Sequence, residues 1–258
     1  MKKILALLAI STIIACNTKN NCPYSEPANL NDGLIVSTLE KHNLKKSAFE
    51  KANHDICSGK YGNIHSVLII HNNELVVEQY YNGWDKDELH FLASTTKSFS
   101  PLLIGMAIEK GMIKDADQKM VDFFPNHTNL REDSLKSLVT LRNLLTNSSG
   151  FEWDEQSQPI DSPKNMGVQM DQKDNWLEAS LDLPMDTTPG TRYTYSGPNN
   201  IILGEIIKIT TGQNIADFAA DHLFKPLGIK EFNWFAKNGI YDVGGGLKLK
   251  SRDIAKFA

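Results

Sequence analysis

The fold of this 258-residue chain is decided by the stretch His90-Phe91-Leu92-Ala93-Ser94-Thr95-Thr96-Lys97-Ser98-Phe99. It contains a Ser-x-x-Lys element, Ser94 to Lys97, at the start of a segment whose apolar residues recur with helical spacing. Residues three apart share one face of a helix, so the Lys97 amine can reach the Ser94 hydroxyl. A serine needs a base to become a nucleophile, and a desolvated lysine can serve. The spacing therefore predicts a serine nucleophile at a helix start.

The predicted helix runs from Ser94 to about Lys110 and ends at Gly111. We expect a bend at Pro101, because proline removes a backbone hydrogen-bond donor. Alone, the four-residue pattern is weak, since about one chance occurrence is expected in a chain of this length. The alternative interpretation is an N-capping serine followed by a solvated lysine. The rest of the sequence decides between the two.

Three further segments follow in order. They are Val139-Thr140-Leu141-Arg142-Asn143-Leu144-Leu145-Thr146-Asn147-Ser148-Ser149-Gly150, then Tyr195-Ser196-Gly197 with Asn199 and Leu203-Gly204, then Gly244-Gly245-Gly246-Leu247 with Ser251-Arg252-Asp253-Ile254-Ala255-Lys256-Phe257. Together with the first stretch they resemble the serine β-lactamase and penicillin-binding-protein superfamily. The resemblance is greatest to its class C branch, which includes esterases, D-aminopeptidases and amidases such as 6-aminohexanoate-dimer hydrolases, and it covers about residues 62–258.

The resemblance implies a role for each matching residue. Ser94 attacks an ester or amide carbonyl and forms an acyl-enzyme, while Lys97 helps to deprotonate it. Tyr195 lies across the cleft and passes a proton to the leaving group or activates the deacylating water. Gly197 and Trp153 are the expected substrate-binding residues, although a buried structural Trp153 is an equal alternative. Gly197 stands where the family often has Asn, which favours an esterase or linear-amide hydrolase over a β-lactamase.

The implied fold class is α+β, of the β-lactamase/transpeptidase type, with an antiparallel sheet flanked by helices and an all-helical region. The β-rich runs 66–70 and 74–81, separated by His71-Asn72-Asn73, predict a hairpin, since consecutive asparagines tolerate positive φ. Adjacent apolar residues in both runs indicate a sheet covered on both faces. We also expect a loop-rich region over residues 151–190. Four further helices are expected, over residues 34–52, 141–145, 199–210 and 215–223.

The first residues have the features of an export signal. Two lysines precede an apolar run that ends in Ala15-Cys16, which resembles a lipobox and makes residues 1–15 a lipoprotein signal peptide. We then expect Cys16 to be lipidated and the chain to be a membrane-anchored lipoprotein of the bacterial cell envelope, in the periplasm-facing or outer membrane. A plain secretory signal is the alternative. Residues 16–60 are expected to form a tether and N-terminal segment, and 61–258 the hydrolase domain.

Two structural questions stay open in the sequence. In an oxidising compartment Cys22 and Cys57 can pair, or they can be two unrelated thiols. The family's Lys-Thr-Gly or His-x-Gly element, expected well after residue 257, is not in the sequence, which stops at Ala258 inside an expected helix. We therefore expect a domain incomplete at its C-terminus, with C-terminal strands missing, a hairpin with an exposed apolar edge, poor folding and little activity.

Other functions are disfavoured. A net charge of −4 and scattered basic residues argue against a nucleic-acid partner. The seven histidines show no metal-ligand spacing, no cofactor motif is present, and no Gly-x-Ser-x-Gly elbow indicates an α/β-hydrolase. The leading hypothesis is a serine hydrolase acting on small amides or esters through Ser94. A D,D-peptidase or penicillin-binding protein, and a non-catalytic binding protein of the same fold, are the alternatives.

Overall fold

The computed structural model describes residues 22–258, so the expected signal peptide, residues 1–15, and the expected lipidation site Cys16 lie outside the described residues. In this described part, no helix combines the length and the apolar character needed to cross a bilayer. Contacts within the chain divide it into two compact units. The first holds residues 22–29 and Ile35–Asp85, and the second holds Leu30–Leu34 and Lys86–Ala258.

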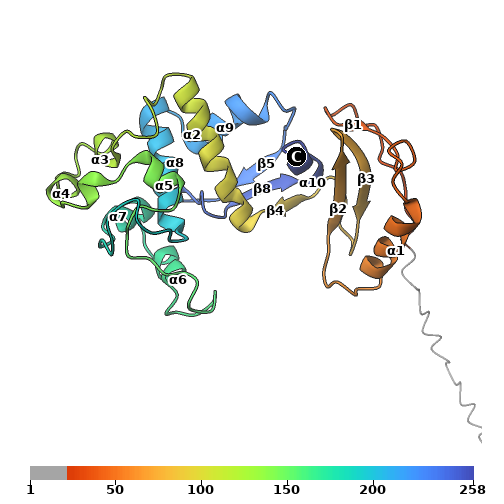
Figure 1. Ribbon diagram of the computed structural model, residues 1–258, viewed down its shortest axis with the longest axis horizontal. Helices are drawn as coiled ribbons and strands as arrows, with labels where there is room; N and C mark the ends of the chain where they lie inside the picture. The colour runs from red at the N-terminus through yellow and green to blue at the C-terminus, as the bar shows by residue number, and fades with distance from the viewer. Residues whose placement is uncertain (1–21) are drawn as a thin grey trace, which may run out of the picture. The chain divides into compact units, whose positions relative to one another are not determined.

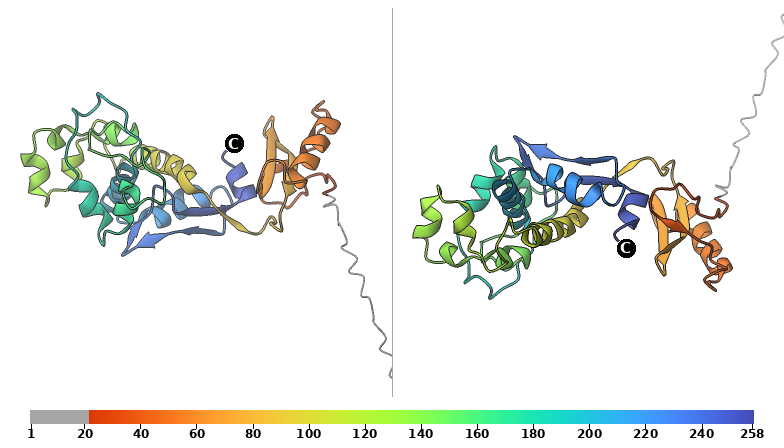
Figure 2. Two further views of the ribbon diagram at one scale, coloured as in Figure 1. Left: turned by 90° about the horizontal axis from the view of Figure 1, so that it is seen from below. Right: turned by 90° about the horizontal axis from the view of Figure 1, so that it is seen from above.

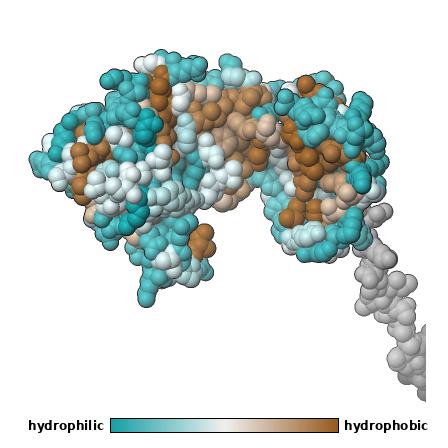
Figure 3. All heavy atoms as spheres, viewed as in Figure 1, coloured by the Kyte–Doolittle hydropathy of each residue, from teal (hydrophilic) through white to brown (hydrophobic). Residues whose placement is uncertain are grey.

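The first unit is built on a three-stranded sheet of order β1-β3-β2, formed by β1 (Ile35–Val36), β3 (Glu74–Tyr80) and β2 (Ser66–His71) (Figure 1). Strands β2 and β3 are antiparallel, and Asn72 and Asn73 join them with φ of 51° and 62°, which confirms the predicted hairpin. Five consecutive residues of β3, from Leu75 to Gln79, are buried, as expected of a strand covered on both faces. The edge strand β2 is more open, and hydrophobic residues reach the surface there (Figure 3).

The predicted helix over 34–52 is wrong at its start. Ile35 and Val36 instead pair in parallel with β3, and helix α1 (Lys46–Cys57) begins only after a series of turns. Asn43 has a φ of +55° in those turns, a conformation that a right-handed helix does not contain. The β-branched pair favours a strand, and the turn residue separates it from the helix.

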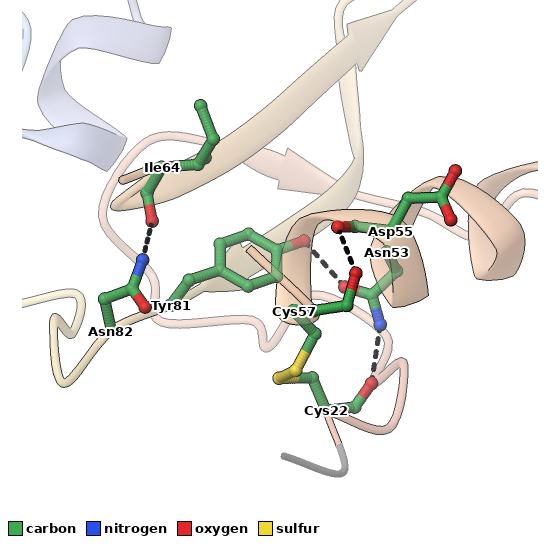
Figure 4. The surroundings of a disulfide bond; sticks show 8 residues. Cys22, Asn53, Asp55, Cys57, Ile64, Tyr81 and Asn82 are labelled. Atoms are coloured by element: carbon green, nitrogen blue, oxygen red, sulfur yellow. Dashed lines mark hydrogen bonds between the residues drawn. A yellow bond between two sulfur atoms is a disulfide. The ribbon is translucent and has the colours of Figure 1, made fainter. Parts of the chain in front are cut away.

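Cys22 and Cys57 form a disulfide, which settles the pairing that the sequence left open (Figure 4). Their α-carbons are 6.1 Å apart, within the usual range for a bridge. Beside the bridge, the side-chain nitrogen of Asn53 donates to the Cys22 carbonyl at 2.6 Å. The Tyr81 hydroxyl donates to the side-chain oxygen of Asn53, also at 2.6 Å. The bridge and these bonds hold the first described residues, α1 and the end of β3 together.

The second unit contains an antiparallel sheet of order β4-β8-β5, from β4 (Leu89–Phe91), β8 (Leu247–Lys250) and β5 (Phe232–Trp234). A further two-stranded sheet pairs β6 (Ala236–Lys237) with β7 (Ile240–Tyr241). Beside the strands lies a helical region that includes α3 to α7 (Figure 2). The helical elements are η1 (Ala93–Ser98), α2 (Phe99–Glu109), α3 (Met120–Phe123), α4 (Thr128–Glu132), η2 (Lys136–Leu138), α5 (Leu141–Leu145), α6 (Met166–Asp171), α7 (Trp176–Leu181), α8 (Gly197–Thr211), α9 (Ile215–Ala219), the π-helical η3 (Ala220–Phe224) and α10 (Ser251–Ala255).

Most helix predictions in this unit are confirmed. Helix α5 covers 141–145 and begins with a capping box between Thr140 and Asn143. Helix α8 contains the predicted 199–210 and ends at Gly212, whose φ of 75° is the left-handed conformation that terminates helices. The predicted helix over 215–223 is α9 continued by one π-helical turn. The last helix ends at Ala255, so the expectation that Ala258 lies inside a helix is wrong.

Helix α8 is the centre of the second unit's hydrophobic core. Ten consecutive residues, from Pro198 to Ile207, are buried, so this helix is covered on all sides. Helices α2, α5, α7 and α9 pack against it. Leu103 and Ile104 of α2 and Ile202 and Ile206 of α8 have no exposed surface. This buried pair of helices is the rigid support from which the candidate site is built.

Candidate active site

Ser94 and Lys97 lie one turn apart on η1, which directly follows strand β4. Lys97 Nζ is 3.4 Å from Ser94 Oγ and donates to it. The predicted α-helix from Ser94 is wrong in its first turn, since residues Ala93–Ser98 form a 3₁₀-helix and α2 begins at Phe99. A 3₁₀-helix has three residues per turn, so residues three apart eclipse each other. The observed geometry therefore brings the hydroxyl and the amine together more directly than an α-helix does.

Pro101 explains part of this difference. It is the third residue of α2 and cannot donate the α-helical hydrogen bond to the Lys97 carbonyl four residues earlier. The Ser100 hydroxyl lies 3.1 Å from that carbonyl oxygen and 2.9 Å from the side-chain oxygen of Asn200, so its one hydrogen is shared between these two acceptors. We predicted a bend at Pro101, but the change of helix type comes earlier, between Ser98 and Phe99. Proline in the first turn of an α-helix is tolerated.

The turn that carries Ser94 is attached to strand β8. The Leu92 amide donates to the Leu247 carbonyl at 2.9 Å, and the Leu247 amide donates to the hydroxyl of the fully buried Thr96 at 3.3 Å. Between them, Ala93 has a φ of +45°, which is rare for a residue with a β-carbon. These contacts hold the strained residue in place and leave Ser94 exposed at the surface of the turn.

Lys97 is the point where three separate segments meet. Its Nζ donates to the Gly244 carbonyl at 2.7 Å and lies 4.8 Å from the ring centroid of Tyr195, in addition to its contact with Ser94. The Tyr195 hydroxyl has no hydrogen-bond partner among residues 22–258. The structure thus brings together the three residues for which the sequence predicted a catalytic role.

Helix α8 and the loop that follows α5 position Tyr195. The residue after it, Ser196, is the N-cap of α8 and accepts from the Asn199 amide at 3.4 Å. The residue before it, Thr194, donates its amide to the Asn147 carbonyl at 2.7 Å. The side chain of Asn199 also donates to that of Asn147, at 3.1 Å. Ser196 therefore serves as a helix cap rather than as a second nucleophile.

A cavity of about 310 Å³ lies at the Ser94 turn. The predicted residues Ser94, Lys97, Trp153 and Gly197 all line it, whereas Tyr195 contacts Lys97 but is not among the lining residues. Its size suits a small organic molecule. Apolar walls come from residues such as Val168, Met170 and Ile201.

Two further features of the cavity were not predicted, and the first is Asp242. Its carboxylate accepts hydrogen bonds from the backbone N–H groups of Gly244 and Gly245. Burial raises the pKa of this carboxyl, and the Lys97 charge and the two amides oppose that rise. An Asp two residues before glycines is a turn signal that could have been recognised in the sequence. Asp242 holds the glycine loop whose carbonyl binds Lys97.

The second unpredicted feature is Glu155. Its Oε2 accepts from the indole N–H of Trp153 at 2.7 Å and from the backbone N–H of Gly197 at 3.1 Å. A β-carbon at position 197 would stand only 3.1 Å from the same oxygen. The absence of a side chain at Gly197 thus leaves room for this carboxylate. No local sequence signal links residues 42 positions apart in a loop-rich region.

A larger cavity, of about 720 Å³, lies elsewhere in the second unit. Its charged residues are largely paired with each other. Arg252 binds Asp32 through two hydrogen bonds of 2.7 and 3.1 Å, and Lys256 binds Asp253 at 2.8 Å. It contains neither the Ser-x-x-Lys pair nor another activated nucleophile, so we assign the candidate active site to the cavity at Ser94. Among the described residues, no group of three or more His, Cys, Asp or Glu side chains is placed to hold a metal ion.

Comparison with known proteins gives a consistent picture. The model of the beta-lactamase family matches residues 65–240. Protein flp of Staphylococcus aureus (strain MW2) is 26% identical over 205 residues, which are 76% of this chain and 37% of that protein. A protein of Escherichia coli (strain K12) that is proposed to be a D-alanyl-D-alanine carboxypeptidase is 26% identical over 184 residues, 64% of this chain and 41% of its own length. The chain spans less than half the length of the curated relatives it matches.

Solved structures share the fold. A protein of Bacillus anthracis that is proposed to be a 6-aminohexanoate-dimer hydrolase superposes with a TM-score of 0.66 at 21% identity, covering 77% of this chain and 54% of that one. This likeness, with the helices and small antiparallel sheets of the second unit, confirms the predicted α+β, β-lactamase/transpeptidase-like fold.

Proposed function

Because the chain belongs to the beta-lactamase family, we propose that it is a serine hydrolase that cleaves small amides or esters through an acyl-enzyme on Ser94. The observation that carries the proposal is the 3.4 Å contact between Ser94 Oγ and Lys97 Nζ in the wall of a cavity. A serine hydroxyl next to an amine that can take its proton is the arrangement that nucleophilic catalysis requires. The relative proposed to be a carboxypeptidase adds support for a hydrolytic activity.

In the proposed first half-reaction, the Lys97 ammonium first loses a proton to solvent, and the free amine then accepts the proton of the Ser94 hydroxyl. Ser94 Oγ then bonds to the substrate carbonyl carbon, and the carbonyl oxygen takes the negative charge. The backbone N–H of Ser94, at the start of η1, is the donor we propose for that oxygen. As the intermediate collapses, the bond to the leaving group breaks. The leaving amine or alcohol takes a proton from Lys97 or the Tyr195 hydroxyl and departs.

The second half-reaction releases the acyl group. A water molecule attacks the ester carbonyl of the acyl-enzyme and gives a proton to the Lys97 amine or to the Tyr195 phenolate. The bond between Ser94 Oγ and the acyl carbon breaks, Ser94 regains a proton, and a carboxylic acid leaves. No cofactor is needed, because both steps are acid–base chemistry.

A fluorophosphonate probe tests this proposal, because it labels activated serines covalently. We expect labelling of the chain and slow but measurable hydrolysis of p-nitrophenyl acetate, and we expect Ser94→Ala to abolish both. Ser98→Ala, at an exposed serine of the same 3₁₀-helix, is the matched control and should retain both. Labelling that survives in Ser94→Ala would place the nucleophile elsewhere.

A second candidate function is a D,D-peptidase, which is favoured by the Escherichia coli relative. Stable labelling by fluorescent penicillin without ester turnover would support it. A folded chain that neither probe labels would support the third alternative, a non-catalytic binding protein. The membrane anchor on Cys16 remains a separate proposal, tested by metabolic labelling with a fatty-acid analogue in the parent and in Cys16→Ala.

A further inference from the structure

The charged side chains that line the Ser94 cavity are strongly biased toward acidic ones. Three of the lining residues are carboxylates, Glu155, Asp171 and Asp242, and one is a cation, Lys97. Lys97 already donates to the Gly244 carbonyl and to Ser94. The positive charge of Lys97 is therefore already in contact with polar groups of the protein. A ligand in the cavity meets more acidic than basic side chains.

Glu155 is held in a fixed orientation by the protein. One of its oxygens, Oε2, accepts two hydrogen bonds, from the Trp153 indole and the Gly197 amide. The other oxygen, Oε1, has no hydrogen-bond partner among the described residues. A carboxylate that is fixed through one oxygen and free at the other is ready to accept a hydrogen bond from a ligand cation.

The other two carboxylates are partly compensated. Asp242 accepts two backbone N–H groups of the glycine loop. Burial raises the pKa of the Asp171 carboxyl. The nearby charge of Lys237 lowers the same pKa by a smaller amount. Lys237 does not line the cavity. Burial raises the pKa of both carboxyls, so the proposal rests on Glu155, which has the oxygen that is free to bind.

Gly197 is the residue that leaves room for Glu155. A side chain at this position would place its β-carbon 3.1 Å from Glu155 Oε2 and would crowd the carboxylate. With no side chain at position 197, the Glu155 carboxylate comes close enough to accept a hydrogen bond from this backbone N–H. Gly197 thus makes room for an anionic group in the cavity wall.

We propose that the Ser94 site selects substrates that carry a protonated amino group close to the scissile carbonyl, with Glu155 as the residue that binds the ammonium. The apolar walls at Trp153, Val168 and Ile201 then hold an apolar side group of the same substrate. Amino-acid amides and esters have this chemistry. Substrates with a carboxylate near the scissile bond, penicillins included, are repelled by the same charges. The proposal rests on the proposed function, since it names the substrate class of that site.

The test measures binding in Ser94→Ala, so that it does not depend on turnover. Isothermal titration at pH 6.5, where the α-amino group is protonated, compares phenylalaninamide with N-acetylphenylalaninamide, in which the charge is absent. We expect the amino amide to bind at least about tenfold more tightly, a typical effect of one charge-assisted hydrogen bond. Equal affinities for the two amides would overturn the proposal.

Two added variants assign the preference to Glu155. Glu155→Gln keeps the size and the acceptor oxygen that binds Trp153 and Gly197 but removes the charge, and it should bring the two affinities within about twofold. Glu152→Gln is the matched control, because this exposed residue of the same loop does not line the cavity, and it should retain the tenfold preference. A preference that persists in Glu155→Gln would also overturn the assignment. Fluorophosphonate labelling of the parent chain decides the hydrolase function separately.

Discussion

Tyr195 meets Lys97 through the face of its ring, with Lys97 Nζ 4.8 Å from the ring centroid. The contact uses the π-electrons of the ring and leaves the hydroxyl out of any hydrogen bond among the described residues. The ring and the hydroxyl of Tyr195 therefore have separable roles. The ring stabilises the ammonium by a cation–π interaction, and the hydroxyl is available for proton transfer.

Tyr195→Phe separates these roles. We expect the variant to keep the parent's melting temperature, because the ring and its contact with Lys97 remain. We expect p-nitrophenyl acetate hydrolysis to fall by about 100-fold, the usual contribution of a positioned general acid or base. Tyr193→Phe, at an exposed tyrosine two residues away, should leave both quantities unchanged. An unaltered rate in Tyr195→Phe would exclude the hydroxyl from catalysis.

Gly246→Ala probes the glycine loop that binds Lys97. An added β-carbon would stand 2.9 Å from the β-carbon of Asp242 and 3.1 Å from that of Phe235. The loop cannot move away easily, because the Gly246 amide and carbonyl are both hydrogen-bonded. We expect the free energy of unfolding to fall by about 1–3 kcal/mol, as in other overpacked sites.

Gly105→Ala is the control for this substitution. Gly105 lies in α2, and its added β-carbon would meet no atom within 4 Å. Replacing a helical glycine by alanine should stabilise the protein by about 0.5–1 kcal/mol. Urea unfolding monitored by circular dichroism measures both variants. If the two substitutions shift the midpoint in the same direction, the steric argument at Gly246 fails.

Asp32→Asn tests the ion pair with Arg252, whose side chain is only 5% exposed. The two hydrogen bonds from the guanidinium hold the pKa of Asp32 below its usual value. The stability that comes from ionised Asp32 is therefore present above its unfolded pKa of about 3.9 and is lost as the pH falls through the lower folded value. At pH 7 the variant should lose about 1–2 kcal/mol, less than for a fully buried pair because Asp32 is partly solvated.

The difference between Asp32→Asn and the parent should accordingly shrink below about pH 4. Urea unfolding at pH 7 and at pH 3 measures it. Asp117→Asn is the matched control, since Asp117 binds Arg142 with the same two-bond geometry on an exposed surface. It should change stability less at either pH. A constant difference for Asp32→Asn across this range would show that its pKa is not coupled to folding.

The features that depend on residues close together in the sequence could be predicted from it. The spacing of Ser94 and Lys97 brings them together in either a 3₁₀- or an α-helix, so the contact was predictable although the helix type was not. The Asn72-Asn73 turn and the Gly212 helix end were recognised because each needs a positive φ that few residues adopt. The contact between Lys97 and Tyr195 was expected only from the family resemblance.

Other parts of the site depend on packing between distant segments. Glu155 reaches Gly197 across 42 residues, and its direction is set by the Trp153 indole, which no periodic pattern encodes. The Lys97 contact with Gly244 spans 147 residues and requires the glycine loop to be held by Asp242. The start of α1 was misplaced for a similar reason, since β1 exists only because β3 is there to pair with it.

The hydrogen bond from the Leu247 amide to Thr96 Oγ1 gives the site its own spectroscopic reporter. The fully buried Thr96 side chain accepts the bond and lies on the same 3₁₀-turn as Ser94, so the amide proton can exchange with solvent deuterium only when that turn separates from β8. The exchange rate of one backbone proton therefore reports on the opening of the turn that carries the nucleophile, in the resting protein and without any substrate.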